Sequence, residues 1–103
     1  MQDQHETPTV FRRWPDGTID AIFPYIPGAG YRVMGYTRVG QHFEADYDCA
    51  VGTTKSAKPH EYQSLKTELE GLGYKIKVIK RASRDKMSKA RTEMMVNYLS
   101  LST

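Results

Sequence analysis

The sequence predicts a single α+β domain, in which an antiparallel meander of about four strands precedes a helix, a fifth strand and a C-terminal helix. Its 103 residues fit one domain of ordinary size. Alternation of apolar and polar residues recurs through the first half, and helical spacing appears in the second. Short turn signals between the alternating segments favour antiparallel pairing. We expect the order β-β-β-β-α-β-α, with the helices on one face of the sheet.

The first strand pair is marked by a turn signal. Residues 1–9 are polar and aperiodic, which predicts a flexible tail before a single domain at residues 10–103. Residues 10–14 and 18–24 have β character and flank Pro15-Asp16-Gly17, which is typical of a tight turn. The two segments are therefore predicted to form a hairpin.

Two further strands are expected after a loop. Two prolines and two glycines within residues 24–30 exclude a central strand there. β character resumes over residues 31–38, and a turn is expected at residues 39–41. The clearest alternation of the chain covers residues 43–51, where an apolar face that includes Cys49 opposes an acidic face. We expect Cys49 to be an inert core residue.

Helical spacing begins at residue 59. Residues 59–72 place their leucines on one side, Pro59 suits the first turn, and Gly73 suits the position after the end. Residues 74–81 are predicted to be the fifth strand. Ser83 is the expected N-cap of the last helix.

The last helix carries more apolar surface than one stripe. The stripe consists of Met87, Ala90, Met94, Tyr98 and Leu101, and the apolar residues beside it are Met95, Val96 and Leu99. We favour a monomer in which this helix folds over its own sheet, because so short a chain has few other groups to cover the sheet. The alternative is a homo-oligomeric structural or assembly protein that pairs through this helix.

Positive charge is concentrated between residues 75 and 91. This stretch holds eight basic residues and one acid, so it carries +7 within a chain of net charge +3. Such a field attracts phosphate backbones or acidic protein surfaces, although a solvated surface has the same composition. The basic residues predicted to contact a partner are Lys77, Lys80, Arg81, Arg84, Lys89 and Arg91.

Three tyrosines near the Pro/Gly loop are further candidates for partner contact. Tyr25, Tyr31 and Tyr36 are interleaved with Arg32 and Arg38. Tyrosine and arginine are favoured at protein interfaces, and aromatic rings stack on unpaired bases. Core packing with hydroxyls at the rim is the alternative interpretation.

The acidic face of residues 43–51 raises the alternative of a small metal-dependent enzyme. His42, Asp46 and Asp48, together with Glu44, would project from one strand face, with residues two positions apart separated by about 6.6 Å. Such a set binds a divalent metal or acts as a general base with an orienting group. A solvent-facing strand has the same pattern, and no second His or Cys nearby completes a ligand set. We therefore predict no metal, no cofactor and no catalytic residue.

Two classes of protein are disfavoured by composition. No apolar run approaches the roughly 20 residues needed to span a bilayer, and the N-terminal segment lacks the layout of a signal peptide. We therefore expect no membrane contact. The single cysteine excludes an internal disulfide and a multi-cysteine zinc site.

Several short segments, spread over roughly residues 10–91, resemble the sequences of a group of known proteins. They are Val10-Phe11-Arg12, Asp20-Ala21-Ile22-Phe23-Pro24, Val39-Gly40-Gln41-His42, Asp46-Tyr47, Glu61-Tyr62, Gly73-Tyr74 and Val78-Ile79-Lys80-Arg81. Together they resemble a group of small proteins carried by phages, plasmids and other mobile elements of bacteria. The chain departs from that group at Lys58, where a capping Thr is usual before the proline.

The resemblance implies an accessory protein in the cytoplasm of a bacterial host cell. Such proteins are often stoichiometric inhibitors of host defence systems, including CRISPR effectors. With the basic stretch, this predicts a non-enzymatic protein that binds nucleic acid or a nucleoprotein complex. The most specific version of this prediction is an anti-CRISPR-like inhibitor of a bacterial defence nuclease.

Overall fold

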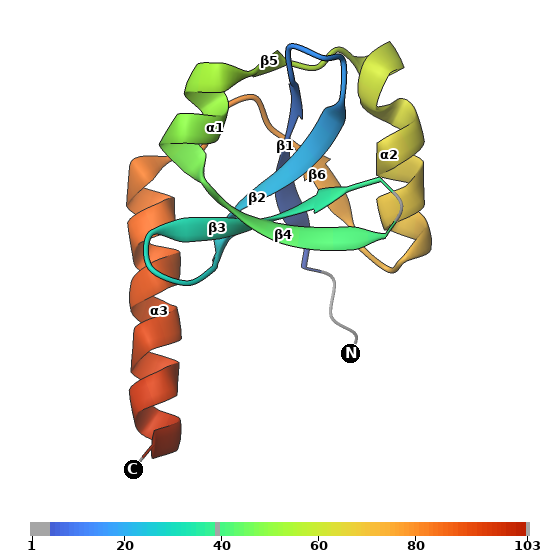
Figure 1. Ribbon diagram of the computed structural model, residues 1–103. Helices are drawn as coiled ribbons and strands as arrows, with labels where there is room; N and C mark the ends of the chain where they lie inside the picture. The colour runs from blue at the N-terminus through green and yellow to red at the C-terminus, as the bar shows by residue number, and fades with distance from the viewer. Residues whose placement is uncertain (1–4, 39, 103) are drawn as a thin grey trace.

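The fold is built on a meander of four antiparallel strands (Figure 1). The computed structural model describes residues 5–38 and 40–102, so the predictions for residues 1–4, Val39 and Thr103 lie outside it. The strands are β1 (Thr7–Arg13), β2 (Ile19–Pro27), β3 (Arg32–Thr37) and β4 (Gln41–Asp46), in the spatial order β4-β3-β2-β1. The α+β class and the meander predicted from the sequence are confirmed. The exclusion of a central strand from residues 24–30 is wrong for residues 24–27, because β2 continues to Pro27 through a shift of register after Phe23.

Two short strands complete the sheet along the outer edge of β1. β5 (Lys55–Ser56) pairs antiparallel with the end of β1, and β6 (Ile76–Val78) pairs parallel with its beginning. Residues 7–9 therefore belong to the sheet, and the prediction that they form a flexible tail is wrong. Their polar sequence shows no alternation, but β6 supplies backbone partners and Thr9 is fully buried.

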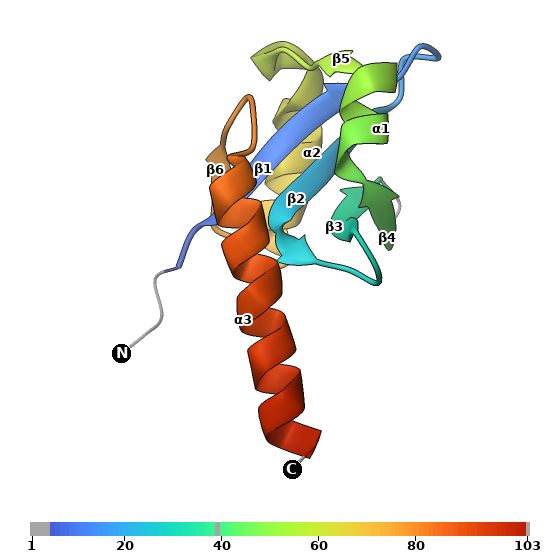
Figure 2. The ribbon, with the colours of Figure 1, turned by 90° about the vertical axis from the view of Figure 1, so that its left-hand side faces the viewer.

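The helices lie on both faces of the sheet, which corrects the prediction of one covered face. Figures 1 and 2 show α2 (Pro59–Gly71) on the opposite side of the sheet from α1 (Tyr47–Thr53) and α3 (Arg84–Ser102). Under α2 the buried cluster consists of Phe11, Ala21, Phe23, Tyr36, Leu65 and Leu69. On the other face it consists of Val10, Ile22, Val33, Tyr47 and Ala50.

The β4 strand is shorter than the alternation predicted. It ends at Asp46, whose carboxylate accepts the backbone N–H of Cys49 at 3.0 Å and so caps α1. Tyr47 and Val51 fit helical spacing as well as alternation, whereas the buried Ala50 fits only the helix, and the Asp46 cap stabilises the helix. Cys49 is consequently exposed on α1, not buried on a strand.

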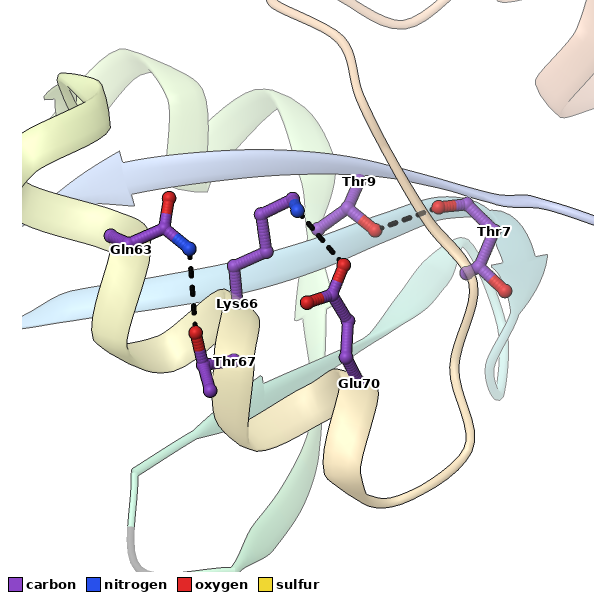
Figure 3. A network of polar contacts seen from close by, with 6 residues as sticks. All are labelled: Thr7, Thr9, Gln63, Lys66, Thr67 and Glu70. Carbon is purple, nitrogen blue, oxygen red and sulfur yellow. Dashed lines mark hydrogen bonds and ion pairs between the residues drawn. The ribbon is translucent and has the colours of Figure 1, made fainter.

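The bounds of α2 agree closely with the sequence prediction. Lys58 stands at its N-cap, and the Glu61 carboxylate accepts the Lys58 N–H at 2.8 Å. Gly73 follows the helix with a φ of 108°, a conformation that favours glycine. Along its exposed side, Lys66 pairs with Glu70 at 2.8 Å, beside the beginning of β1 (Figure 3). The fifth predicted strand shortens to β6.

Only the first half of α3 packs on the sheet. Ser83 Oγ accepts the Lys86 N–H at 3.3 Å at the beginning of the helix, and Met87 packs against the cluster under α1. The C-terminal half of the helix projects away from the sheet (Figure 2), and Val96 and Tyr98 are 59% and 66% exposed. The side chain of Leu101 lies outside the described part of the chain. The predicted docking of this helix on its own sheet therefore holds for its first half.

Candidate functional site

The structure gathers three basic side chains from the charged stretch around one hollow. Lys77 comes from β6, Arg81 from the turn that follows, and Lys86 from the first turns of α3. The hollow has a volume of about 330 Å³, and its other lining residues are Pro8, Tyr25, Ile79, Ala82 and Ser83. We call this site the basic hollow. All three cations are exposed to solvent.

Backbone contacts hold the walls of the basic hollow in place. Pro8 and Lys77 are register partners in the parallel pairing of β1 with β6. Just after β6, the N–H of Ile79 donates to the carbonyl of Thr9 at 2.9 Å. The turn therefore leaves the sheet from a fixed point, and the fold sets the backbone positions of its basic residues.

Tyr25 fixes the other end of this turn. Its hydroxyl accepts the backbone N–H of Ser83 at 2.8 Å, at the point where α3 begins. The side chain is half-buried, and it lines the basic hollow. Of the three tyrosines predicted to contact a partner, Tyr25 is the one that lines the basic hollow.

Tyr31 and Tyr36 lie elsewhere. Tyr31 is 87% exposed at the tip of the loop between β2 and β3. Tyr36 is 1% exposed in the core under α2, and its hydroxyl donates to the carboxylate of Glu68, which raises the pKa of Tyr36. Tyr36 is therefore inaccessible to a partner, and its role is the core packing that was the alternative interpretation.

Two of the predicted basic contacts make contacts within the chain. Arg84 pairs with the carboxylate of Asp48, and this hydrogen bond raises the pKa of Arg84. Arg91 donates to the carbonyl oxygens of Gly28 and Arg32, at 3.2 and 2.6 Å. Both arginines line a second cavity and not the basic hollow. We therefore leave them out of the candidate surface.

Lys80 and Lys89 extend the positive surface beyond the hollow. Both are exposed, and Lys80 lies in the turn between β6 and α3. Lys89 follows Lys86 by three positions on α3, so the two side chains are neighbours along one side of the helix. The positive surface therefore continues from the hollow along α3.

The acidic face predicted on one strand is divided in the structure. His42 Nε2 lies 2.8 Å from the Tyr74 hydroxyl, and Glu44 accepts the N–H of Ala29 at 3.2 Å. Asp46 caps α1, and Asp48 is on that helix rather than on β4. Among residues 5–38 and 40–102, no three His, Cys, Asp or Glu side chains lie close enough to hold a metal ion.

The second cavity has a volume of about 530 Å³ and lies on the opposite side of α3 from the basic hollow. Its charged lining residues are Asp46, Asp48, Arg84 and Arg91, so positive and negative charges balance. Tyr31 and the prolines of β2 supply apolar walls. This balance gives the second cavity no preference for an anion, in contrast to the basic hollow.

Sequence reasoning missed five of the eight lining residues of the basic hollow, which are Pro8, Ile79, Ala82, Ser83 and Lys86. Lys86 lies in the charged stretch, but nothing in its spacing separates it from its neighbours. Pro8 was assigned to the tail, because its contact with Lys77 depends on pairing between distant strands. The parallel β1–β6 pairing was the missing information.

Three comparisons with known proteins give no match. No protein-family model, curated protein or solved structure is significantly similar to the chain. None of the helices within the described residues is long and apolar enough to cross a membrane. The function is therefore inferred from the geometry of the basic hollow.

Proposed function

We propose that this protein is a non-enzymatic binding protein that holds the phosphate backbone of nucleic acid, free or within a nucleoprotein complex, in the basic hollow. One observation carries the proposal. Lys77, Arg81 and Lys86 come from three successive structural elements and line the same hollow, and none of its eight described lining residues is acidic.

The physical reason is the concentration of like charge in a concave surface. Side chains of one sign around a hollow focus the electrostatic field and attract counter-ions of the opposite sign. Arginine holds phosphate through two parallel hydrogen bonds, and lysine acts as a point charge. A polymer of phosphates is the common cellular ligand that satisfies several such cations at once.

The sequence resemblance suggests a biological setting for this binding. In the sharpest form of the proposal, the protein acts in the bacterial cytoplasm as an inhibitor of a defence nuclease, such as a CRISPR effector. It would bind the nucleic acid held by that nuclease. The resemblance supports this setting, and the basic hollow supports the nucleic-acid contact.

The test measures affinity for an oligonucleotide at about 50 mM and 200 mM salt. Three phosphate contacts with a slope of about −0.7 to −0.9 each predict an affinity loss of about 20- to 40-fold over this range. The variant Lys77→Gln/Arg81→Gln/Lys86→Gln should bind weakly and lose most of this salt dependence.

The matched control is Lys55→Gln/Lys58→Gln/Arg38→Gln, which removes the same charge from exposed positions outside the hollow. It should keep most of the affinity. Equal losses in both triple variants would show that overall charge, and not the basic hollow, drives binding. That result would contradict the proposal.

A further inference from the structure

We infer that the basic hollow selects single-stranded nucleic acid, because it seats one unstacked base against its apolar lining residues while the three cations hold the flanking phosphates. The inference rests on the proposed function and narrows its ligand. It derives from the lining of the hollow, which contains apolar as well as basic residues. Phosphate binding alone does not explain the apolar residues.

Much of the lining is apolar. Pro8, Ile79 and Ala82 share the hollow with the side chain of Tyr25, and the cations Lys77, Arg81 and Lys86 complete it. A phosphate group gains nothing from apolar contacts, whereas every nucleobase has an apolar face that stacks on aromatic or apolar side chains. The lining therefore matches a nucleotide better than it matches a phosphate alone.

The size of the hollow agrees with this assignment. Its volume of about 330 Å³ is roughly ten times the share of one liquid water molecule. A phosphate occupies a small part of that space, and a planar base beside it fills more. The hollow is therefore large enough for one ring and its adjacent phosphate.

The apolar part of the lining is preorganised. Ile79 is anchored by its N–H to the Thr9 carbonyl, and Pro8 is fixed by the pairing of β1 with β6. The hydroxyl of Tyr25 is held by the N–H of Ser83, so its orientation is set before any ligand binds. A surface that needs no reordering loses less entropy when it binds a base.

Duplex nucleic acid does not offer this ligand. Its bases are paired and stacked, and an enzyme or binder that uses a single base must first take it out of the stack. Single strands and loops expose unstacked bases at no such cost. Because stacking is tolerant of base identity, we expect little sequence preference.

The experiment compares three probes on the intact protein: oligothymidylate of about 15 nucleotides, an abasic strand of the same length, and a duplex of that length. The abasic strand keeps the phosphates and lacks the bases. We expect oligothymidylate to bind about 5- to 150-fold more tightly than the abasic strand, the factor that stacking of one base supplies. The duplex should bind more weakly than oligothymidylate.

Two substitutions test the role of Tyr25. Tyr25→Leu and Tyr25→Phe both remove the hydroxyl that holds the Ser83 N–H, so they differ only in the ring, and Tyr25→Leu should show the smaller ratio of oligothymidylate affinity to abasic-strand affinity. Tyr25→Phe retains the ring and should keep the preference for oligothymidylate. If Tyr25→Leu fails to fold, the comparison of probes on the unaltered protein still decides the question.

The outcomes separate this inference from the proposed function. Equal affinity of the unaltered protein for oligothymidylate and the abasic strand would overturn base seating but leave phosphate binding intact. Preference for the duplex would overturn the selection of single strands in the same way. Failure to bind any of the three probes would contradict the proposed function as well.

Discussion

The hydroxyl of Tyr25 accepts a hydrogen bond of 2.8 Å from the backbone N–H of Ser83, 58 positions further along the chain. This contact joins the end of β2 to the beginning of α3. It satisfies one of the N–H groups that a helix leaves unpaired at its N-terminus. The same side chain lines the basic hollow, so one residue links the stability of α3 to the shape of the candidate site.

We expect Tyr25→Phe to destabilise the protein by about 1 kcal/mol, because the Ser83 N–H loses its acceptor while the ring still packs. The corresponding decrease in Tm is about 4–8 °C for a domain of this size. Thermal denaturation measures it. Tyr31→Phe is the control, since Tyr31 is 87% exposed, and it should leave the Tm unchanged. Equal Tm values for the two variants would contradict the structural role of Tyr25.

Arg91 should act on the loop between β2 and β3 and not on the ligand. Its guanidinium donates to the carbonyls of Gly28 and Arg32, which are the two ends of that loop. In Arg91→Leu we expect amide hydrogen exchange in the loop to become about tenfold faster, as for the loss of about 1.4 kcal/mol.

Affinity for nucleic acid should change little in Arg91→Leu, because Arg91 does not line the basic hollow. Lys86→Leu provides the opposite comparison, since it should weaken binding without loosening the loop. A loss of affinity in Arg91→Leu as large as that in Lys86→Leu would show that Arg91 also contacts the ligand.

Glu61 should contribute a pH-dependent part of the stability. The backbone N–H of Lys58 donates to its carboxylate, and Arg13 lies 3.3 Å away, so the pKa of Glu61 is lowered. A carboxylate with a lowered folded-state pKa stabilises the protein above its unfolded pKa of about 4.3, and this contribution is lost as the pH falls through the folded-state value.

We therefore expect Glu61→Gln to be less stable than the unaltered protein at pH 7, with a difference that shrinks as the pH falls from about 5 to below 4. Urea denaturation at several pH values gives the free energy of unfolding of both proteins. A difference that stays constant across this range would show that the charge of Glu61 contributes nothing.

Local patterns were sufficient to predict the class of the fold and most of its elements. The turn after β1, the first turn of α2 at Pro59 and the N-cap at Ser83 depend on neighbours within a few positions. The boundary between β4 and α1 was mispredicted, because Tyr47 and Val51 fit both periods, and only Ala50 and the Asp46 cap favour the helix.

The sequence does contain a signal that helices cover both faces of the sheet. Consecutive apolar residues, Val10-Phe11 and Ile22-Phe23, are typical of strands buried on both sides. No such signal separates the basic residues of the hollow from Arg84 and Arg91. The contacts of these two arginines reach residues 36 to 63 positions away. Charge density is readable from a sequence, but the use of each charge depends on tertiary contacts.

The projecting half of α3 should be dispensable for stability. Met95, Val96 and Tyr98 are each at least 50% exposed, so their removal gives up little buried apolar area. We expect a truncation after Met95 to keep nearly the same Tm, whereas a truncation after Lys86 also removes Met87 and Arg91 and should unfold the protein.

Sedimentation of the unaltered chain and of the truncation after Met95 tests the homo-oligomer alternative. We favour a monomer in both cases. A dimer that is lost on truncation would assign the projecting half of α3 to self-association. A large decrease in Tm on that truncation would instead show that this half packs on the sheet.

The parallel pairing of β1 with β6 has a consequence for synthesis on the ribosome. β1 is the first strand of the sheet to emerge, but its outer edge is closed only by β5 and β6, which are made much later. In the nascent chain that edge remains unpaired, and an unpaired edge recruits other strands. Long-range parallel pairing is also slow to form. The vulnerable interval for aggregation therefore lasts from the emergence of β1 from the ribosome until β5 and β6 have emerged.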